Sequence, residues 1–135
     1  MNKISESVIK LDHAGKTSGS TRYVADFPAD GMLFGKLVYS KKPHARLLTV
    51  KVPPLPDGYL IVDKNDVPGK NEVHVVLDDT PVFADETVEF IGDPILMVVG
   101  PVEKEVKHIA SAIEIVYEDL PAVFDMRESD TVFFE

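Results

Sequence analysis

No cysteine occurs among the 135 residues of the sequence. Its absence excludes a disulfide framework, a thiolate metal site, iron–sulfur ligation and a cysteine nucleophile within this chain. It is also consistent with the cytoplasmic location that we expect, because disulfides are typical of secreted proteins. Long apolar runs are lacking as well. None approaches the roughly 18 residues of a membrane-spanning helix, and no basic start followed by an apolar stretch marks a secretory signal.

Basic residues are in the minority. The chain carries 14 Lys and Arg against 23 Asp and Glu, which gives a formal net charge of -9. A nucleic-acid surface needs a concentration of basic residues to neutralise phosphates, so we expect no nucleic-acid partner, and we expect no membrane partner either. The length suits one domain with a single core, which buries about two thirds of the surface that the unfolded chain exposes.

The histidines do not form a recognisable metal motif. They are far apart in the sequence and lack the spacing of metal ligands, such as two histidines four apart on a helix. The four are His13, His44, His74 and His108. We expect His108 to lie beside the apolar stripe of a helix, and His44 to bond a neighbouring carbonyl. Both roles are structural.

Other catalytic signatures are also missing. Successive strand residues point to opposite faces, so adjacent acids do not share one site, and we interpret the acidic pairs as solvated turns. These pairs are Asp78–Asp79, Asp85–Glu86 and Glu118–Asp119. Residues 15–19 are typical of a loop, and Lys10 stands where a phosphate-binding loop ending at Thr17 needs glycine. Neither Gly-x-Ser-x-Gly nor Gly-x-Gly-x-x-Gly occurs. We therefore expect no catalytic, cofactor-binding or metal-binding residue in this chain.

The strongest pattern in the sequence is a strand, a helix and a second strand in succession. Residues 94–99 form an uncharged apolar run bounded by glycines, which predicts a strand covered on both faces. Residues 101–113 place apolar side chains at helical spacing, which predicts an amphipathic helix with Glu103 and Lys107 paired on its other side. Residues 114–117 resume a strand. A right-handed crossover would make the two strands parallel in one sheet.

The remaining residues predict short strands separated by turns. These strands cover residues 31–40, 45–52, 59–62, 73–77 and 81–84. Residues 65–69 predict a turn that includes a single helical turn stopped by Pro68. The pattern as a whole indicates an α+β fold, a mixed β-sheet with one main amphipathic helix (about 101–113) packed on it.

An ordered set of short motifs gives the sequence a family resemblance. The motifs are Arg22–Tyr23 with Asp26, Met32–Leu33, Ser40-x-x-Pro43–His44–Ala45–Arg46, Asp66–Val67–Pro68–Gly69, Val88-x-Phe90–Ile91–Gly92-x-Pro94 and Val116–Tyr117–Glu118–Asp119–Leu120–Pro121–Ala122–Val123. Over about residues 8–125, their order and spacing resemble the α/β-hammerhead domain of the xanthine dehydrogenase and aldehyde oxidase family. Two features depart from that family. Residues 51–57 are shortened and rich in proline where a short helix is common, and Asp93 stands where glutamine is frequent.

The resemblance implies a structural domain at the N-terminal end of a molybdenum-binding catalytic subunit. Among family members, it favours a xanthine dehydrogenase-like hydroxylase of purines or N-heterocycles. It implies that the isolated domain is non-catalytic, and that molybdenum–molybdopterin, 2Fe-2S clusters and FAD belong to other domains or subunits. The implied partners are the other domains of the large subunit and an iron–sulfur subunit or domain.

We expect three segments along the chain. They are a flexible leading segment at 1–20, the hammerhead domain at 21–125, and a tail at 126–135 that leads into further domains of a longer chain. A piece of a larger subunit should expose apolar surface, at Val132–Phe134 or around Met32–Phe34.

Two alternatives stay open from the sequence. One is a free-standing protein-interaction module that shares the fold. The other is a small hydrolase that uses acidic residues from the pairs Asp78–Asp79 and Glu118–Asp119.

Overall fold

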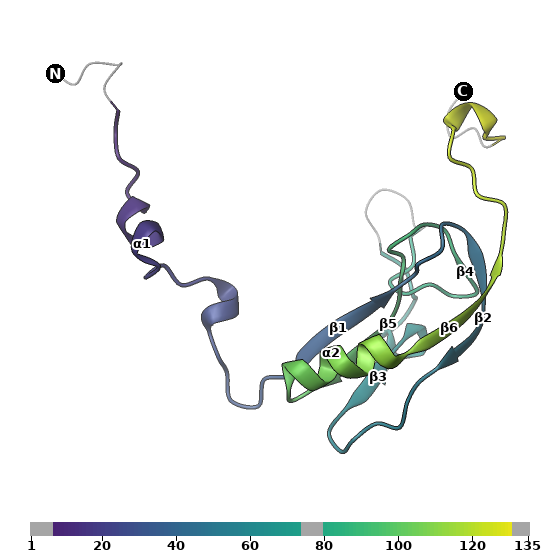
Figure 1. Ribbon diagram of the computed structural model, residues 1–135, viewed down its shortest axis with the longest axis horizontal. Helices are drawn as coiled ribbons and strands as arrows, with labels where there is room; N and C mark the ends of the chain where they lie inside the picture. The colour runs from purple at the N-terminus through teal and green to yellow at the C-terminus, as the bar shows by residue number, and fades with distance from the viewer. Residues whose placement is uncertain (1–6, 74–79, 131–135) are drawn as a thin grey trace. The chain divides into compact units, whose positions relative to one another are not determined.

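The computed structural model describes residues 7–73 and 80–130 (Figure 1). The chain divides into two units, Met1–Met32 and Leu33–Glu135. The described part of the first unit contains helix α1 (His13–Ser18) and the 3-10 turn η1 (Val24–Asp26), neither of which has a buried residue.

Helix α1 forms where the sequence predicted a loop. Two local interactions support it. Lys16 pairs with Asp12 one turn earlier at 2.5 Å, and the Thr17 hydroxyl donates to the carbonyl of His13 at 2.7 Å. The helix ends at Gly19, whose φ of 71° lies in the left-handed region that favours glycine. Local side-chain contacts therefore override the loop-like composition of these residues.

The second unit contains a first antiparallel sheet of three strands. Its strands are β1 (Phe34–Tyr39), β5 (Pro94–Gly100) and β3 (Leu60–Val62), in the order β1-β5-β3. The central strand β5 buries Ile95, Leu96 and Val98. Alternate strand residues point to opposite faces, so burial of both Ile95 and Leu96 confirms that this strand is covered on both sides.

A second antiparallel sheet contains β4 (Thr87–Val88), β2 (Ala45–Lys51) and β6 (Glu114–Asp119), in the order β4-β2-β6. β4 pairs with β2 only at Ala45 and Arg46, whereas β6 runs beside β2 from Ala45 to Lys51. The 3-10 turns η2 (Lys64–Asp66) and η3 (Met126–Glu128) complete the unit. The single helical turn predicted before Pro68 is thus confirmed by η2.

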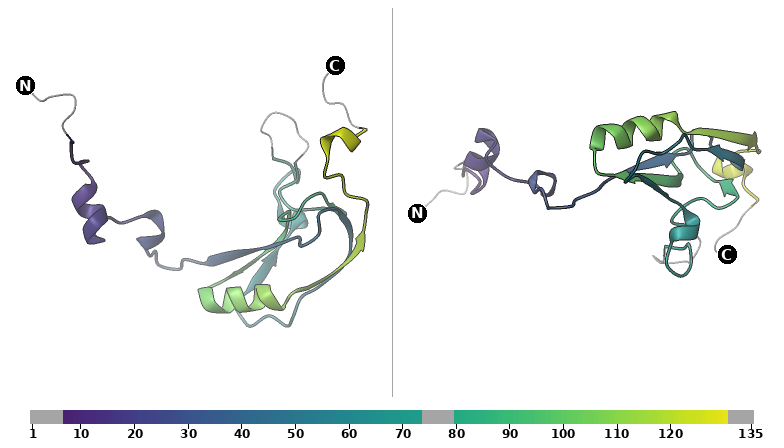
Figure 2. Two further views of the ribbon diagram at one scale, coloured as in Figure 1. Left: turned by 45° about the horizontal axis from the view of Figure 1, so that its top comes forward. Right: turned by 90° about the horizontal axis from the view of Figure 1, so that it is seen from below.

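Helix α2 (Glu103–Ala112) confirms the predicted main helix and contacts β1 and β5 (Figure 2). It buries Val106 and Ile109, which pack with Leu96 and Val98 of β5. Glu103 and Lys107 pair across one turn at 2.5 Å, as the sequence predicted. A second core cluster joins β2, β4 and β5 through Ala45, Ala84, Val88 and Ile95. The two clusters lie on opposite faces of β5.

The parallel pairing predicted for residues 94–99 and 114–117 is wrong. These residues form β5 and β6, which belong to different sheets. β5 is already flanked by β1 and β3, so no edge of β5 is left for β6, and β6 pairs with β2 instead. Every strand pair among the described residues is antiparallel, so the α+β class is confirmed but the single mixed sheet is not.

The strand predicted at residues 81–84 does not form. Phe83 and Ala84 are buried, yet the backbone of Phe83 bonds the side chain of Asn71 and the N–H of Ala84 donates to the carbonyl of Pro94 at 2.7 Å. Of the neighbouring prediction at 73–77, only Val73 is described, in a single bridge to Thr80. Residues 74–77 lie outside the described residues. The apolar pattern at 81–84 therefore reflects burial in an irregular segment.

Candidate functional site

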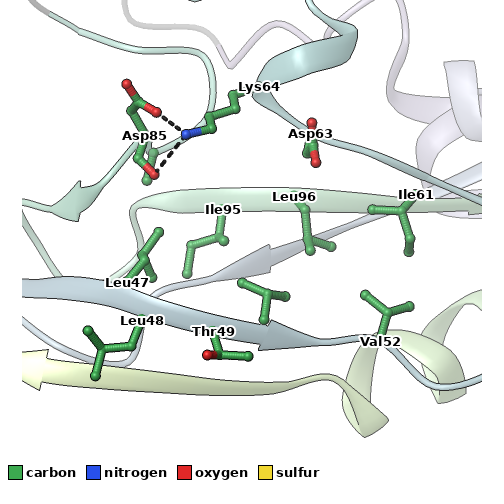
Figure 3. Close-up of a pocket in the computed structure, with 12 residues that line it drawn as sticks. Leu47, Leu48, Thr49, Val52, Ile61, Asp63, Lys64, Asp85, Ile95 and Leu96 are labelled. Atoms are coloured by element: carbon green, nitrogen blue, oxygen red, sulfur yellow. Dashed lines mark hydrogen bonds and ion pairs between the residues drawn. The ribbon is translucent and has the colours of Figure 1, made fainter.

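One candidate binding site is the Lys64 groove, an opening of about 320 Å³ between β2 and the β3–β5 side of the first sheet. Figure 3 shows Ile61, Ile95 and Leu96 on one side of it, Leu47 of β2 on the other, and Lys64 at the rim. The walls are therefore mainly aliphatic. Such a groove suits an apolar group better than a charged substrate.

The polar groups at the rim of the Lys64 groove are already engaged. Lys64 forms an ion pair with Asp85, and Figure 3 draws this pair as dashed lines. The Asp63 carboxylate caps η2 by accepting hydrogen bonds from the backbone N–H and the side-chain amide of Asn65, at 2.7 and 2.9 Å. A general acid or base needs a group free to reach a substrate. These residues serve the fold instead.

A second opening, the His44 groove, has a volume of about 630 Å³. Its lining includes His44, Glu89, Phe90, Pro121 and Phe124. The His44 Nδ1 atom lies 2.6 Å from the Pro121 carbonyl oxygen, and Nε2 lies 3.7 Å from a carboxylate oxygen of Glu89. The predicted bond from His44 to a neighbouring carbonyl is thereby confirmed. The imidazole ties the start of β2 to the segment that follows β6.

The other histidines are not brought together. His13 begins α1, and His108 lies exposed on α2, while His74 is outside the described residues. Among residues 7–73 and 80–130, no group of three or more His, Cys, Asp or Glu side chains has a geometry that could hold a metal ion.

The acidic pair Glu118–Asp119 is separated into two individual ion pairs, and in the pair Asp85–Glu86 it is Asp85 that binds a cation, Lys64. Glu118 contacts Arg46 at 2.7 Å, and its neighbour Asp119 contacts Lys42 at 2.8 Å. Both acids lie on β6, so the expectation of solvated turns is wrong for this pair, although both side chains are exposed. The pair at Asp78–Asp79 lies outside the described residues. Each described acid of the hydrolase hypothesis therefore faces a cation rather than another acid.

Asp93 is the polar residue whose role sequence reasoning missed. Only 3% of its surface is exposed. The pKa of Asp93 is raised, mainly because burial disfavours the charged carboxylate. The hydrogen bond from the Glu89 backbone N–H opposes this rise, and the nearby Glu89 charge adds to it. A usable signal was present in Gly92-Asp93-Pro94, because a short carboxylate beside glycine and proline is typical of a turn stabilised by the side chain. Ser40, which is also buried, holds the same turn through its backbone.

Apolar side chains also reach the surface. Met32 and Leu33 are 41% and 53% exposed, which confirms the exposure predicted around Met32–Phe34. Val132–Phe134 lie outside the described residues. Around the His44 groove, Phe90, Ile91 and Phe124 are exposed as well. None of the described helices has the length and apolar character needed to cross a membrane.

Comparison with known protein families identifies a matching family for most of the chain. Residues 18–121 match the family model described as "Aldehyde oxidase and xanthine dehydrogenase, a/b hammerhead domain". The chain belongs to this family. The resemblance drawn from the ordered motifs is thus confirmed, and the two small sheets with one main helix are its hammerhead fold.

The hammerhead chain has curated relatives in bacteria. It is 32% identical over 117 residues to a probable xanthine dehydrogenase subunit from Bacillus subtilis, covering 84% of this chain and 16% of the relative. It is 28% identical over 129 residues to the "Nicotinate dehydrogenase large molybdopterin subunit" of Eubacterium barkeri, covering 93% of this chain and 30% of the relative. The chain therefore spans less than a third of these relatives.

Solved structures show the same hammerhead fold. Quinoline 2-oxidoreductase from Pseudomonas putida 86 is 27% identical with a TM-score of 0.71, covering 87% of this chain and 16% of that structure. The aldehyde oxidoreductase of Desulfovibrio gigas is 26% identical with a TM-score of 0.68, covering 82% and 14%. In both, the matched region is a small part of a much longer polypeptide.

Proposed function

We propose that this chain is the hammerhead domain of the molybdenum-binding large subunit of a molybdenum hydroxylase, and that it completes the architecture of that subunit without catalysing the reaction. The observation that carries the proposal is the family match over residues 18–121 together with the short span of the relatives that the chain covers. In this proposal residues 21–125 are the hammerhead domain, residues 1–20 lead into it, and residues 126–135 lead into further domains.

The parent enzyme is proposed to act on a purine or another N-heterocycle. Xanthine, nicotinate and quinoline, the compounds named for three of the proteins similar to this chain, are all nitrogen heterocycles. The similarity to an aldehyde oxidoreductase makes an aldehyde the competing substrate class. A cytoplasmic location and an iron–sulfur subunit or domain as partner belong to the same proposal.

Within residues 7–73 and 80–130, the side chains present do not fit the molybdenum cofactor itself. The described residues offer no cluster of metal ligands, and each of their buried side-chain polar atoms already has a hydrogen-bond partner. A cofactor with phosphate and metal groups needs unpaired donors aimed at it. We therefore assign molybdenum–molybdopterin, the 2Fe-2S clusters and FAD to other parts of the parent enzyme.

A free-standing interaction module with the same fold is the alternative. Exposed apolar residues such as Leu33 and Phe124 favour an interaction role in either case, because such surface is typical of contact sites. The hammerhead domain of a larger subunit and the free-standing module differ in whether the gene encodes further domains beside these residues. In the module, the partner would be a separate protein.

The first experiment is to read the open reading frame downstream of residue 135. Several hundred further residues with a glycine-rich molybdopterin-binding region support the proposal, whereas a stop codon directly after Glu135 supports the module. The second experiment compares the parent enzyme with the 135-residue chain by metal analysis and by turnover of xanthine and nicotinate. Stoichiometric molybdenum on the isolated chain would refute the assignment of the cofactor to other domains.

A further inference from the structure

A third opening, the Lys36 groove, lies between β1, the last turns of α2 and β6, and has a volume of about 720 Å³. α2 packs against β1 and is followed directly by β6, so these three elements lie close together (Figure 1). None of the histidines or acidic residues discussed above as candidates for catalysis lines this groove.

Both strands that border the Lys36 groove are edge strands. β1 is the outermost strand of the first sheet, and β6 is the outermost strand of the second. No backbone hydrogen bond within the described part of the chain joins the outer edge of either strand to another segment. An edge strand presents unpaired N–H and C=O groups that can pair with an added strand.

The groove follows the edge of β1 rather than one of its faces. Its lining contains the consecutive residues 36–41. Alternate side chains of a strand point to opposite faces, so an opening on one face would contact only every second residue. A run of consecutive lining residues therefore places the backbone edge of β1 along the groove.

The floor of the groove is apolar. It is made by partly buried side chains from all three elements: Val38, Ala110, Ile113, Ile115 and Tyr117. An extended segment laid beside β1 would direct every second side chain toward this floor. The floor thus suits a strand with apolar residues at alternate positions.

The rim of the groove on the β1 side carries positive charge that no described residue neutralises. Lys36 and Lys41 are exposed, and within the described ranges neither side chain forms an ion pair or a hydrogen bond. By contrast, Lys107 is paired with Glu103, and Glu114 lies 3.7 Å from Lys51. Two unpaired lysines beside an open strand, on a chain of net charge -9, favour a segment with carboxylates at its ends.

We propose that the Lys36 groove is a docking site for an extended segment from another domain of the parent enzyme, which adds to β1 as a strand and places carboxylates beside Lys36 and Lys41. The chain covers only 16% and 30% of two relatives, so such a parent has ample sequence to supply the segment. This inference rests on the proposed function, because the occupant belongs to the longer polypeptide. Strand addition to a sheet edge gains its affinity from main-chain hydrogen bonds and its specificity from side chains.

The test uses the 135-residue chain and three synthetic peptides. The probe is acetyl-Glu-Val-Thr-Val-Thr-Val-Glu-amide, the charge control replaces both Glu with Lys, and the backbone control replaces the central Val with Pro, which cannot donate to a strand. Binding is followed by NMR chemical shifts of the backbone amides. We expect the Glu peptide to shift amides of residues 36–39 but not those of β3, the other edge of the same sheet.

Charge variants separate specific docking from general attraction. K36E/K41E should weaken binding of the Glu peptide by about tenfold, since exposed ion pairs each contribute modestly and reversal replaces attraction by repulsion. The matched control K10E/K104E makes the same change in net charge at two exposed lysines outside the groove, and should leave binding unchanged. Thermal unfolding verifies that both variants fold. If K36E/K41E does not fold, K36Q/K41Q takes its place.

Several results would overturn the inference. They are equal binding of the Glu and Pro peptides, shifts confined to β3 or α1, binding unaffected by K36E/K41E, or no saturable binding of the Glu peptide. A dimer of the chain that K36E/K41E dissociates would instead make a second copy the occupant, and would also overturn it. The open reading frame tests the proposed function separately, because peptide binding to β1 does not depend on the length of the gene.

Discussion

The side chain of Asp93 accepts a hydrogen bond from the backbone N–H of Glu89, with 3.0 Å between nitrogen and oxygen. The same turn is bonded to the end of β1, because the N–H of Ser40 donates to the Asp93 carbonyl at 2.8 Å and the N–H of Gly92 donates to the Ser40 carbonyl at 2.9 Å. A buried acid thus holds the loop that leads into the central strand β5.

This arrangement makes stability depend on pH. Burial raises the pKa of Asp93 above its ordinary value of 3.8, with an opposing contribution from the Glu89 hydrogen bond and a further increase from the Glu89 charge. Between the unfolded and the folded pKa, the folded state binds more protons, so the free energy of unfolding falls as pH rises through that window. The stabilising contribution is complete below the unfolded pKa and is lost above the folded one.

We expect D93N to remove this decline, because the amide oxygen can still accept from Glu89 while the side chain no longer titrates. Urea unfolding at several pH values from about 4 to about 8 measures the slope. D57N, which removes an exposed carboxylate, is the control. An unchanged slope in D93N would show that another group causes the dependence.

Gly100 at the end of β5 is required by a close contact. A Cβ atom on Gly100 would lie within 3 Å of three ring atoms of Tyr59. We expect G100A to lower the free energy of unfolding by about 2–3 kcal/mol, as overpacking of a closed site does. The chain lacks tryptophan, so tyrosine fluorescence and circular dichroism report unfolding.

The matched control for G100A is G35A, whose added Cβ would meet the flexible side chain of Met97 at 2.9 Å and should cost less. In the double variant G100A/Y59A, the loss should be smaller than the sum of the two single losses, because the clash is gone. Strict additivity would contradict the contact as the cause.

Val98 fills the contact between β5 and α2. Its surface is 0% exposed, and it packs with Val106 and Ile109. V98A should lower the free energy of unfolding by about 2 kcal/mol through lost apolar burial and the cavity left behind. V102A removes the same atoms at a position that is 53% exposed, and should change stability by less than about 0.5 kcal/mol. Equal losses in chemical denaturation would argue against a core between α2 and β5.

The Asn71 side chain pairs with the backbone N–H and C=O of Phe83, which a neighbouring strand would otherwise bond. Its amide donates to the Phe83 carbonyl at 2.6 Å, and its side-chain oxygen accepts from the Phe83 N–H at 3.0 Å. N71A would leave both backbone groups unpaired beside a buried ring, at a cost of about 2 kcal/mol. N71D keeps the shape but loses the donor, so we expect it to be destabilised as well.

N65A is the control for Asn71, because Asn65 is exposed and its side-chain amide donates to the Asp63 carboxylate. Hydrogen exchange at Phe83 and Ala84 should rise in N71A and stay unchanged in N65A. Unchanged protection in N71A would show that other contacts hold this segment.

Sequence pattern predicted the elements well where the pattern is local. The apolar run at 94–99 became β5, and the helical spacing after it became α2. The role of His44 was also predictable, since a histidine at the start of a strand readily meets a nearby carbonyl, here that of Pro121. The ordered motifs that ended at Val123 were enough to identify the family, because they combine many positions at fixed spacing.

The sequence by itself determined the central strand β5 and the main helix α2, since backbone preference and apolar periodicity act over a few neighbours. The tertiary structure alone decided that β5 and β6 lie in different sheets, because this depends on which edges β1, β3 and β2 already occupy. It also decided that Asp93 is buried, since burial depends on segments far away in the chain. The open edge of β1 beside Lys36 arises for the same reason. Strands that are distant in sequence compete for the available sheet edges, and the local sequence pattern does not predict which strand pairs with which.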